Sequence, residues 1–286
     1  LVPRDIATRE IFDVCVNQHL GINGENVVYL DVSHIPASIL NAKLEGILDI
    51  YQKFVGDDPR KVPMRVAPSV HYSMGGLWVG LDQQTSIPGL FAAGECDYTQ
   101  HGANRLGANS LLSAVFAGMT AGPNAAAYAK GLPEGNSIPQ SVYETAAAKE
   151  KSSYQNILQL DGTENAYRLH QEMGELMTKN VTVVRNNDAL AETLIKLENI
   201  DERLSHIGVQ DKATWGNANA PFIRQLHGMV DLAKVITKGA LERNESRGSH
   251  FKPEFPDRND NEWLKTTIAH ILRSEERFSR NAETDL

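Results

Sequence analysis

Three stripes of apolar residues at helical spacing lie in the segment 138–240, and they constrain the fold of this 286-residue chain more than any other feature. Within each stripe the apolar residues recur every three or four positions, which places them on one face of an α-helix. The stripes are Ala166, Leu169, Met173, Leu176 and Met177; Leu190, Leu194, Leu197, Ile200 and Leu204; and Ile223, Leu226, Val230, Ala233, Ile236 and Ala240. Three long amphipathic helices predict an antiparallel bundle within residues 138–240, with Asn186 or Asn187 as the cap of the second helix.

The residues before this bundle combine short strands with helices, so the chain as a whole is predicted to be α+β. Runs rich in β-branched and aromatic residues favour strands, and Gly and Pro mark the turns between elements. We predict helices over residues 5–19 and 39–54, strands over 27–32, 77–81 and 90–94, and a helix that begins at Ser110 and ends or kinks at Gly122-Pro123. One apolar face of that last helix is formed by Leu111, Leu112, Val115, Phe116 and Met119. One more helix is expected in the charged tail, over 262–278.

The composition argues against several classes of function. The formal net charge is −8, whereas a non-specific nucleic-acid binder needs a basic face. The chain has no run of about 18 apolar residues that would predict a transmembrane helix, and its charged first residues lack the apolar core of a signal peptide. Cys15 and Cys96 have no metal-binding or disulfide spacing, so we expect both to pack as small hydrophobic residues in a reducing compartment.

Arg105 lies in the Gly- and Asn-rich turn Gly102–Gly107, just before a predicted helix. A guanidinium offers a planar fork of donors that matches a carboxylate, and glycine neighbours let a ligand approach the backbone closely. The first N–H groups of the helix, at Ser110 and Leu111, are unpaired and lie at its positive end. The turn therefore fits an anionic ligand. The plainer alternatives are a surface arginine in a loop and a helix for which Asn109 or Ser110 is simply the N-cap.

Two further side chains of interest fall in the same stretch, His71 on an extended segment and Glu95 after the apolar run 90–94. An imidazole can donate to an anion or transfer a proton near neutral pH. A carboxylate at the carboxyl end of a buried strand can bind ribose-like hydroxyls. A core histidine and a solvated glutamate are the plainer interpretations. Arg4 has only its neighbour Asp5 as an evident partner, so an ion pair between them is the plain expectation there.

Several motifs taken together resemble one known family. HYSMGG from His71, GLFAAGE up to Glu95 and HGANRLGANSLL from His101, with PRD at Pro3, closely resemble the flavoprotein subunits of succinate dehydrogenase and fumarate reductase. ESRGSH from Glu245 and the FPDRND that follows are similar to the C-terminal region of that family. The joint pattern is specific and extends over essentially the whole chain.

The resemblance covers only about the C-terminal half of the family's subunit. The family's dinucleotide-binding segment with its Gly-rich turn, the segment with the His that carries covalent flavin in many members, and some substrate contacts of the capping domain have no counterpart here. The chain also has no initial Met and starts in what looks like the middle of a segment. We therefore expect a fragment of a longer protein.

The resemblance implies roles for particular residues. Arg4 would be the catalytic residue that moves the proton, and His71 and Arg105 would bind the substrate carboxylates. FAD would be the cofactor, with no metal site, and would be contacted by Glu95, Asn109, Ser110 and Leu111. The positive helix end at Ser110 would stabilise negative charge on the reduced flavin by roughly 0.3–1 kcal/mol, and by up to about 2 kcal/mol if partly buried.

The resemblance also implies a domain organisation. The expected parts are the C-terminal part of a capping domain over residues 1–65, the C-terminal part of an FAD-binding domain over 66–130, a helical domain over 136–245 and a C-terminal tail over 246–286.

The leading hypothesis is that this chain is part of a flavoprotein that oxidises succinate to fumarate in the tricarboxylic acid cycle. Hydride would pass to FAD and electrons to an iron–sulfur subunit of respiratory complex II. The implied partners are succinate, fumarate, the iron–sulfur subunit and membrane-anchor subunits, with no nucleic acid. The implied location is cytoplasmic, peripheral on the inner face of the bacterial cell membrane through those subunits.

Three alternatives stay open. Fumarate reductase has the same motifs and works in the opposite direction. L-aspartate oxidase resembles the chain at the HY–GG and HGANR elements but fits less well at Met74 and at Leu106-Gly107. A non-catalytic docking module belongs to a different class. We expect this chain on its own to be inactive and to bind FAD weakly or not at all, because most nucleotide contacts of the family lie upstream.

Overall fold

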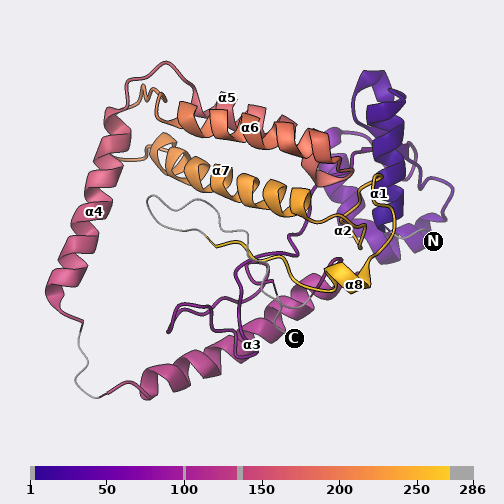
Figure 1. Cartoon of the computed structure of the whole chain (residues 1–286). Helices are drawn as coiled ribbons and strands as arrows, with labels where there is room; N and C mark the ends of the chain where they lie inside the picture. The colour runs from indigo at the N-terminus through magenta and orange to yellow at the C-terminus, as the bar shows by residue number, and fades with distance from the viewer. Residues whose placement is uncertain (1–3, 99–100, 134–137, 271–286) are drawn as a thin grey trace. The chain divides into compact units, whose positions relative to one another are not determined.

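The computed structural model describes residues 4–98, 101–133 and 138–270 and divides the chain into two compact units (Figure 1). The first unit is Leu1–His71 and the second is Tyr72–Leu286, and each has a hydrophobic core of its own. The described residues form a mixed fold that is rich in helix and has one small sheet, in agreement with the predicted class. The predicted domain limits at residues 65, 130 and 245 stay predictions.

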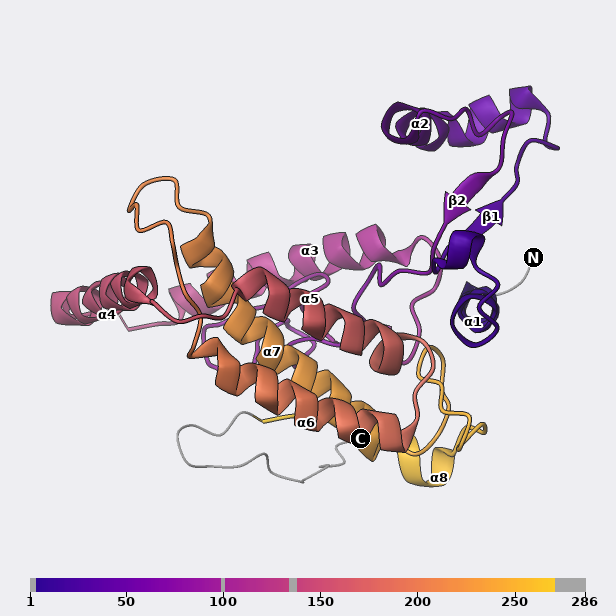
Figure 2. The same cartoon turned by 90° about the horizontal axis from the view of Figure 1, so that it is seen from above.

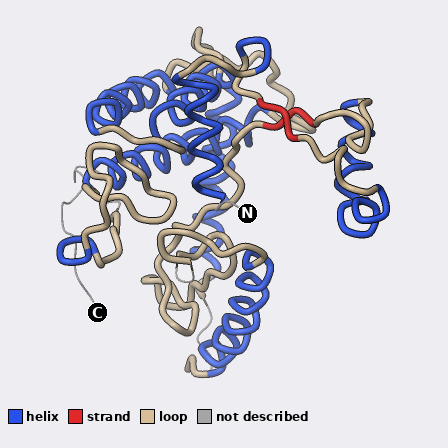
Figure 3. Tube along the Cα trace, turned by 90° about the vertical axis from the view of Figure 1, so that its right-hand side faces the viewer, coloured by secondary structure: helices blue, strands red, loops and turns tan. Residues whose placement is uncertain are grey.

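The first unit is built from helices and a two-stranded ribbon, whose strands are red in Figure 3. Its described elements are α1 (Arg4–Phe12), the π-helical turn η1 (Asp13–Asn17), the 3-10 turn η2 (Ile22–Gly24), β1 (Val28–Leu30), α2 (Ala37–Val55) and β2 (Met64–Val66). The strands are antiparallel, with Tyr29 opposite Arg65. Leu40 and Leu48 of α2 form the core of this unit together with Met64 of β2.

The helix predicted over residues 5–19 is α-helical only as far as Phe12. Beyond it the chain widens into η1, where the backbone N–H of Gln18 donates to the carbonyl of Asp13. The Asp13 carboxylate favours this wider turn, because it accepts hydrogen bonds of 2.6 Å from the side chains of Asn17 and Gln18.

The second unit begins with an irregular segment and continues with helices. Its described elements are α3 (Asn109–Lys130), α4 (Gln140–Gln159), α5 (Ala166–Met177), the π-helical turn η3 (Thr178–Thr182), α6 (Asn187–Leu204), α7 (Asn219–Glu242) and α8 (Asp260–Trp263). The helices α5, α6 and α7 lie side by side (Figure 2). The helix α4 contacts the first part of α7, where Glu150 and Arg224 form an ion pair of 2.8 Å.

The predicted apolar stripes meet between α5, α6 and α7 and form the main core. Its fully buried members include Leu169, Leu197, Ile200, Leu226 and Val230. Ile236 departs from its stripe and is 48% exposed. Asn186, and not Asn187, caps α6, because its side-chain oxygen accepts from the backbone N–H groups of Asp188 and Ala189.

The strands predicted over 77–81 and 90–94 do not form in the described chain. Those segments make only isolated bridges, which pair Leu77 with Asp97, Val79 with Thr85 and Gln84 with Phe91. The chain bends sharply between Gly80 and Gln83, where the N–H of Gln83 donates to the carbonyl of Gly80 and Gln83 has a φ of +68°. This turn limits each pairing to a single position.

Two predicted helix ends differ from the structure. The helix α3 does not end at Pro123 but continues to Lys130, although proline removes one backbone donor, and the alternative of a kink at Gly122-Pro123 stays a prediction. The side-chain amide of Asn124 donates to the carbonyl of Thr120 at 2.9 Å and adds a hydrogen bond in the affected turn. In the tail, α8 ends at Trp263 and residues 264–270 are not helical, while 271–278 lie outside the described residues.

The segment after α7 is fixed by a buried ion cluster around Glu245. The Glu245 side chain is fully buried and accepts from Arg247 at 2.8 and 2.9 Å, from Arg243 at 2.5 Å and from the backbone N–H of Asn259 at 3.0 Å. Burial alone raises the pKa of Glu245, but these donors outweigh it and lower the pKa to about 2. The carboxylate is therefore ionised and fully paired at neutral pH.

We predict that Leu226→Ala lowers the free energy of unfolding by about 2–5 kcal/mol, because it leaves a cavity among the three core helices. Leu232→Ala is the matched control on the same helix, since Leu232 is 63% exposed, and it changes this free energy by less than about 0.5 kcal/mol. Urea unfolding followed by circular dichroism measures both. Equal losses in the two variants would contradict the assignment of the core.

A second prediction concerns Glu245→Gln, which leaves two guanidinium groups without their shared carboxylate. At pH 7 the variant is less stable by about 3–5 kcal/mol. The lowered pKa of Glu245 means that its stabilisation is present above about pH 4.5 and is lost as the pH falls toward about 2. The difference in the free energy of unfolding between the variant and the parent chain therefore shrinks in that range. Denaturant unfolding at several pH values, with Glu198→Gln on the exposed side of α6 as the control, measures this difference. A difference that is constant over this range would refute the prediction.

Candidate functional site

Arg105 is the central group of the candidate site in the second unit. It is only 8% exposed, and its guanidinium lies 4.7 Å from the ring centre of Tyr72. Its Nη1 donates to the carbonyl of Leu106 at 3.2 Å, and its backbone N–H donates to the sulfur of Met74 at 3.1 Å. Its Nε is buried and has no hydrogen-bond partner among the described residues. A buried cation with an unused donor fits an anionic ligand, because an unpaired buried charge is otherwise costly.

A second set of contacts links the loop of Arg105 to the start of α3. His101 Nε2 lies 3.3 Å from the hydroxyl of Tyr72 and 3.1 Å from that of Ser113, and the Tyr72 and His101 rings meet edge to face with centres 5.3 Å apart. The Ser113 hydroxyl in turn donates to the carbonyl of Ser110. Sequence reasoning missed Tyr72 and His101, although both stand in the motifs that carry the family resemblance.

Glu95 contacts the main chain of Ser73, the residue that follows Tyr72. Its side chain is exposed, and its Oε1 accepts from the backbone N–H of Ser73 at 2.9 Å. The neighbouring backbone is close as well, since a Cβ on Gly76 would lie 2.3 Å from the carbonyl oxygen of Cys96, a distance that only glycine avoids. Segments 73–77 and 95–98 are therefore held together by main-chain and side-chain contacts.

The helix α3 begins without a side-chain cap. Its N-cap position is Ala108, in the left-handed region at a φ of +64°, and no side chain there accepts from the helix. The interpretation of Asn109 or Ser110 as the cap is therefore wrong. The N–H groups at Ser110 and Leu111 belong to the first turn, where helical donors lack an acceptor within the helix, so they suit an external acceptor.

The other two predicted site residues belong to the first unit. Arg4 is the first residue of α1 and is exposed, while His71 is the last residue of the unit and is also exposed. Asp5 pairs with Arg9 at 2.9 Å, so the expected ion pair between Arg4 and Asp5 is replaced by one within the next turn of the helix. The structure thus carries Glu95, Arg105 and the start of α3 in the second unit and Arg4 and His71 in the first.

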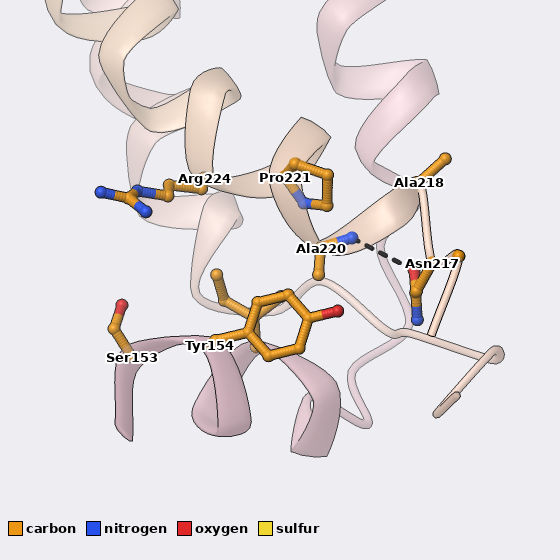
Figure 4. Close-up of a pocket in the computed structure, with 9 residues that line it drawn as sticks. Ser153, Tyr154, Asn217, Ala218, Ala220, Pro221 and Arg224 are labelled. Atoms are coloured by element: carbon orange, nitrogen blue, oxygen red, sulfur yellow. Dashed lines mark hydrogen bonds between the residues drawn. The ribbon is translucent and has the colours of Figure 1, made fainter. Parts of the chain in front are cut away.

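A separate cavity of about 300 Å³ lies between α4 and the start of α7 (Figure 4). Tyr154 and Ser153 line it from α4, and Pro221 and Arg224 line it from α7. Its one charged lining residue, Arg224, is already paired with Glu150. The cavity shares no lining residue with the Arg105 site and offers no evident chemistry.

The two cysteines differ in exposure, and the described residues contain no group that could bind a metal ion. Cys15 is buried as expected, but Cys96 is exposed and its thiol donates to the carbonyl of Ala93 at 3.4 Å, so the prediction for Cys96 is wrong. Within the described ranges, no group of three or more His, Cys, Asp or Glu side chains could hold a metal ion. None of the helices in the described part of the chain has the length and apolar character needed to cross a membrane.

Comparison with known proteins agrees with the motifs. Residues 170–283 match the model of the fumarate reductase flavoprotein C-terminal region, and residues 1–111 match the model of an FAD binding domain. The second match indicates FAD as the cofactor.

Three similar proteins illustrate the relationship. The chain is 61% identical over 270 residues, 94% of its length, to the succinate dehydrogenase flavoprotein subunit of Bacillus subtilis (strain 168), of which it covers 46%. It is 34% identical over 247 residues, 85% of its length, to the fumarate reductase flavoprotein subunit of Escherichia coli (strain K12), of which it covers 40%. A solved structure of quinol-fumarate reductase with menaquinol molecules has a similar fold, with a TM-score of 0.84 and 32% identity over 93% of this chain and 46% of that one.

The chain therefore spans less than half the length of these relatives. Both family matches and all three similar proteins agree with the resemblance carried by the motifs around His71, Glu95 and Arg105. The chain belongs to the family of succinate dehydrogenase and fumarate reductase flavoprotein subunits and is similar to their C-terminal half.

Proposed function

We propose that the flavoprotein subunit containing this chain oxidises succinate to fumarate and passes the electrons to an iron–sulfur subunit. The observation that carries the proposal is the 61% identity to the Bacillus subtilis succinate dehydrogenase subunit, against 34% to the Escherichia coli fumarate reductase subunit. Fumarate reductase, with the same motifs and the opposite direction, is the second candidate, which the solved fumarate reductase neighbour favours.

Arg105 binds one carboxylate of the substrate in this proposal. Its guanidinium is held over Tyr72 and retains an unused donor, Nε, which suits a planar, two-point contact with a carboxylate. The bound anion also supplies the negative charge that the buried guanidinium lacks among the described residues. His71 binds the second carboxylate as a hydrogen-bond donor, so a dianion is recognised at both ends.

Arg4 is the proton carrier of the reaction: its guanidinium donates the proton when fumarate is reduced, and once it has passed its own proton to solvent it accepts one from the carbon next to the one that loses hydride. Its side chain is exposed, and the adjacent carboxylate of Asp5 is occupied by Arg9, so Arg4 has no ion-pair partner among the described residues. A proton-transfer group is useful only if it is available to the substrate, and this arrangement leaves Arg4 available.

The residues at the start of α3 fit FAD. When bound, FAD accepts the hydride from the substrate. The first-turn N–H groups at Ser110 and Leu111 have no side-chain cap and can donate to a flavin acceptor, with Asn109 beside them. The positive end of α3 favours negative charge at that position, by up to about 2 kcal/mol if the contact is partly buried. The exposed carboxylate of Glu95 can accept from hydroxyl groups of the cofactor.

The surface of α3 supports a role within a larger assembly. Five of its apolar side chains are exposed, namely Leu111, Leu112, Val115, Phe116 and Met119. An exposed apolar stripe of this kind is typical of a surface that another polypeptide segment covers. We therefore propose that the chain on its own binds FAD weakly and is inactive, and that the complete enzyme docks on the inner face of the bacterial membrane through iron–sulfur and anchor subunits.

Two simple experiments test this function. A dye assay of the purified complex with succinate, fumarate and aspartate separates succinate dehydrogenase, fumarate reductase and aspartate oxidase activities. If the complex turned over neither succinate nor fumarate, the proposal would be refuted. A visible spectrum of this chain after mixing with FAD and gel filtration tests the second part. Tight stoichiometric flavin uptake would show that the chain needs no further segment.

We predict that Arg105→Ala in the complete subunit weakens dicarboxylate binding by roughly 30- to 1,000-fold, because about 2–4 kcal/mol of charge-assisted contact is lost. Arg224→Ala is the control, since Arg224 is an exposed arginine of α7 outside the site. The dissociation constant of the non-reacting dicarboxylate malonate, measured by calorimetry, is the readout. An unchanged constant for Arg105→Ala would remove Arg105 from the site.

Arg4→Ala is predicted to lower kcat by about 10²- to 10⁴-fold, since general acid–base groups contribute this much. FAD content and malonate affinity stay near those of the parent protein, because Arg4 acts on the proton and not on the carboxylates. Arg65→Ala, an exposed arginine of β2, is the control. Steady-state kinetics together with the flavin absorbance of the purified variant measure the effect. A parallel loss of flavin would point to a structural role instead.

A further inference from the structure

The turn Arg247–His250, far along the chain, touches the loop that carries Arg105. The backbone N–H of Ser249 and the hydroxyl of Ser249 both donate to the carbonyl oxygen of Ala103, each at 3.0 Å. Ala103 precedes Arg105 by two positions in the same loop. Two donors on one carbonyl oxygen fix the position of that peptide more firmly than a single hydrogen bond would.

Gly248 makes the close approach of the two segments possible. It has a φ of +58°, and a Cβ built on it would lie 2.4 Å from the carbonyl oxygen and 2.7 Å from the carbonyl carbon of Ala103. A larger residue would therefore have to push the Ala103 peptide away, in addition to the strain of the left-handed backbone.

The turn itself is firmly anchored. Arg247 binds Glu245 through Nε and Nη2 and binds Asp260 at 2.6 Å, while its backbone exchanges two hydrogen bonds with His250. The His250 ring contacts the carbonyl of Arg243 at 3.0 Å and the guanidinium of Arg185. Burial, together with the nearby Arg185, lowers the pKa of His250 to about 4, so the ring is neutral at pH 7 and accepts from Arg185. The turn is thus a fixed support and not a mobile loop contact.

Arg105 depends on such a support because its own guanidinium has few partners. Its side chain contacts the carbonyl of Leu106 and the face of Tyr72, and its backbone contacts Met74, but no carboxylate among the described residues orients it. The position of its loop therefore determines where the free Nε points. A shift of even 1 Å in a binding group can cost a large factor in function.

We propose that Ser249, with Gly248, is a positioning residue for Arg105 and acts through the carbonyl of Ala103. This inference rests on the proposed binding of a dicarboxylate at Arg105. Ser249 does not touch the substrate. It holds the loop so that the guanidinium faces the carboxylate before the substrate arrives, which spares the ordering that binding would otherwise require.

The test measures malonate affinity by calorimetry in the complete enzyme. Ser249→Ala removes one of the two donors and is expected to weaken malonate binding roughly 3- to 10-fold, as for the loss of one hydrogen bond. Gly248→Ala displaces the loop and has a larger effect. Ser249→Thr keeps the hydroxyl and restores affinity to near the parent value.

Ser246→Ala is the matched control in the same segment. The Ser246 hydroxyl bonds to the backbone of Lys252 on both sides, at 3.0 and 3.2 Å, and has no contact with the Ala103 loop among the described residues. Its loss lowers thermal stability and leaves malonate affinity unchanged. Unfolding curves of Ser249→Ala and Ser246→Ala therefore separate a positioning role from general loosening of the segment.

A double-mutant cycle decides whether the effect runs through Arg105. In an Arg105→Lys background, Ser249→Ala is expected to change malonate affinity less than 2-fold, because lysine lacks the planar guanidinium whose orientation the Ser249 contact would set. The same 3- to 10-fold loss in both backgrounds would overturn the inference, as would parent-like affinity in both Ser249→Ala and Gly248→Ala. Absence of malonate binding to the parent enzyme would instead refute the proposed function, and with it the inference.

Discussion

A buried guanidinium without a carboxylate partner is the constraint on which the candidate site depends. Burying a charge costs several kcal/mol unless partners replace the lost water. Around Arg105 the described partners are weak ones, namely the face of Tyr72 and the carbonyl of Leu106. Such an arrangement is stable only when the rest of the loop is well fixed, and it becomes favourable when an anion arrives. The surroundings of Arg105 are thus better suited to a ligand than to the chain alone.

The arginines near Glu245, in the same unit, differ from Arg105 because each is paired with a carboxylate. Arg243 and Arg247 share one fully buried carboxylate, and Arg247 reaches a second one on Asp260. Their hydrogen-bonding capacity serves the fold and leaves little for a ligand. Residue type alone does not separate these groups from Arg105, since all three are arginines next to glycine or polar residues. The difference lies in which carboxylates the fold brings near them.

The sequence predicted those features that depend on local periodicity. The helix α2 and the shared core of α5, α6 and α7 followed from apolar spacing, whereas the roles of Arg105 and Glu95 stay predictions. The predictions of strands over 77–81 and 90–94 were wrong, because a strand needs a neighbouring strand to pair with, which local sequence does not reveal. The exposure of Cys96 and the continuation of α3 past Pro123 were not predicted for a similar reason. Tertiary contacts, which local sequence does not reveal, override the usual preference of a residue type.

Long-range contacts account for what sequence reasoning could not find at the site. The link between Ser249 and Ala103 joins residues 146 positions apart, and neither residue type is unusual in its own segment. The only local signal was Gly248, whose conformation and close approach to Ala103 forbid a side chain. The two arginine environments are joined through this contact, because the ion cluster that fixes Arg247 also fixes the turn that holds the Arg105 loop. A structural ion cluster can thus contribute to ligand binding without contacting the ligand, through the position that it gives to one peptide group.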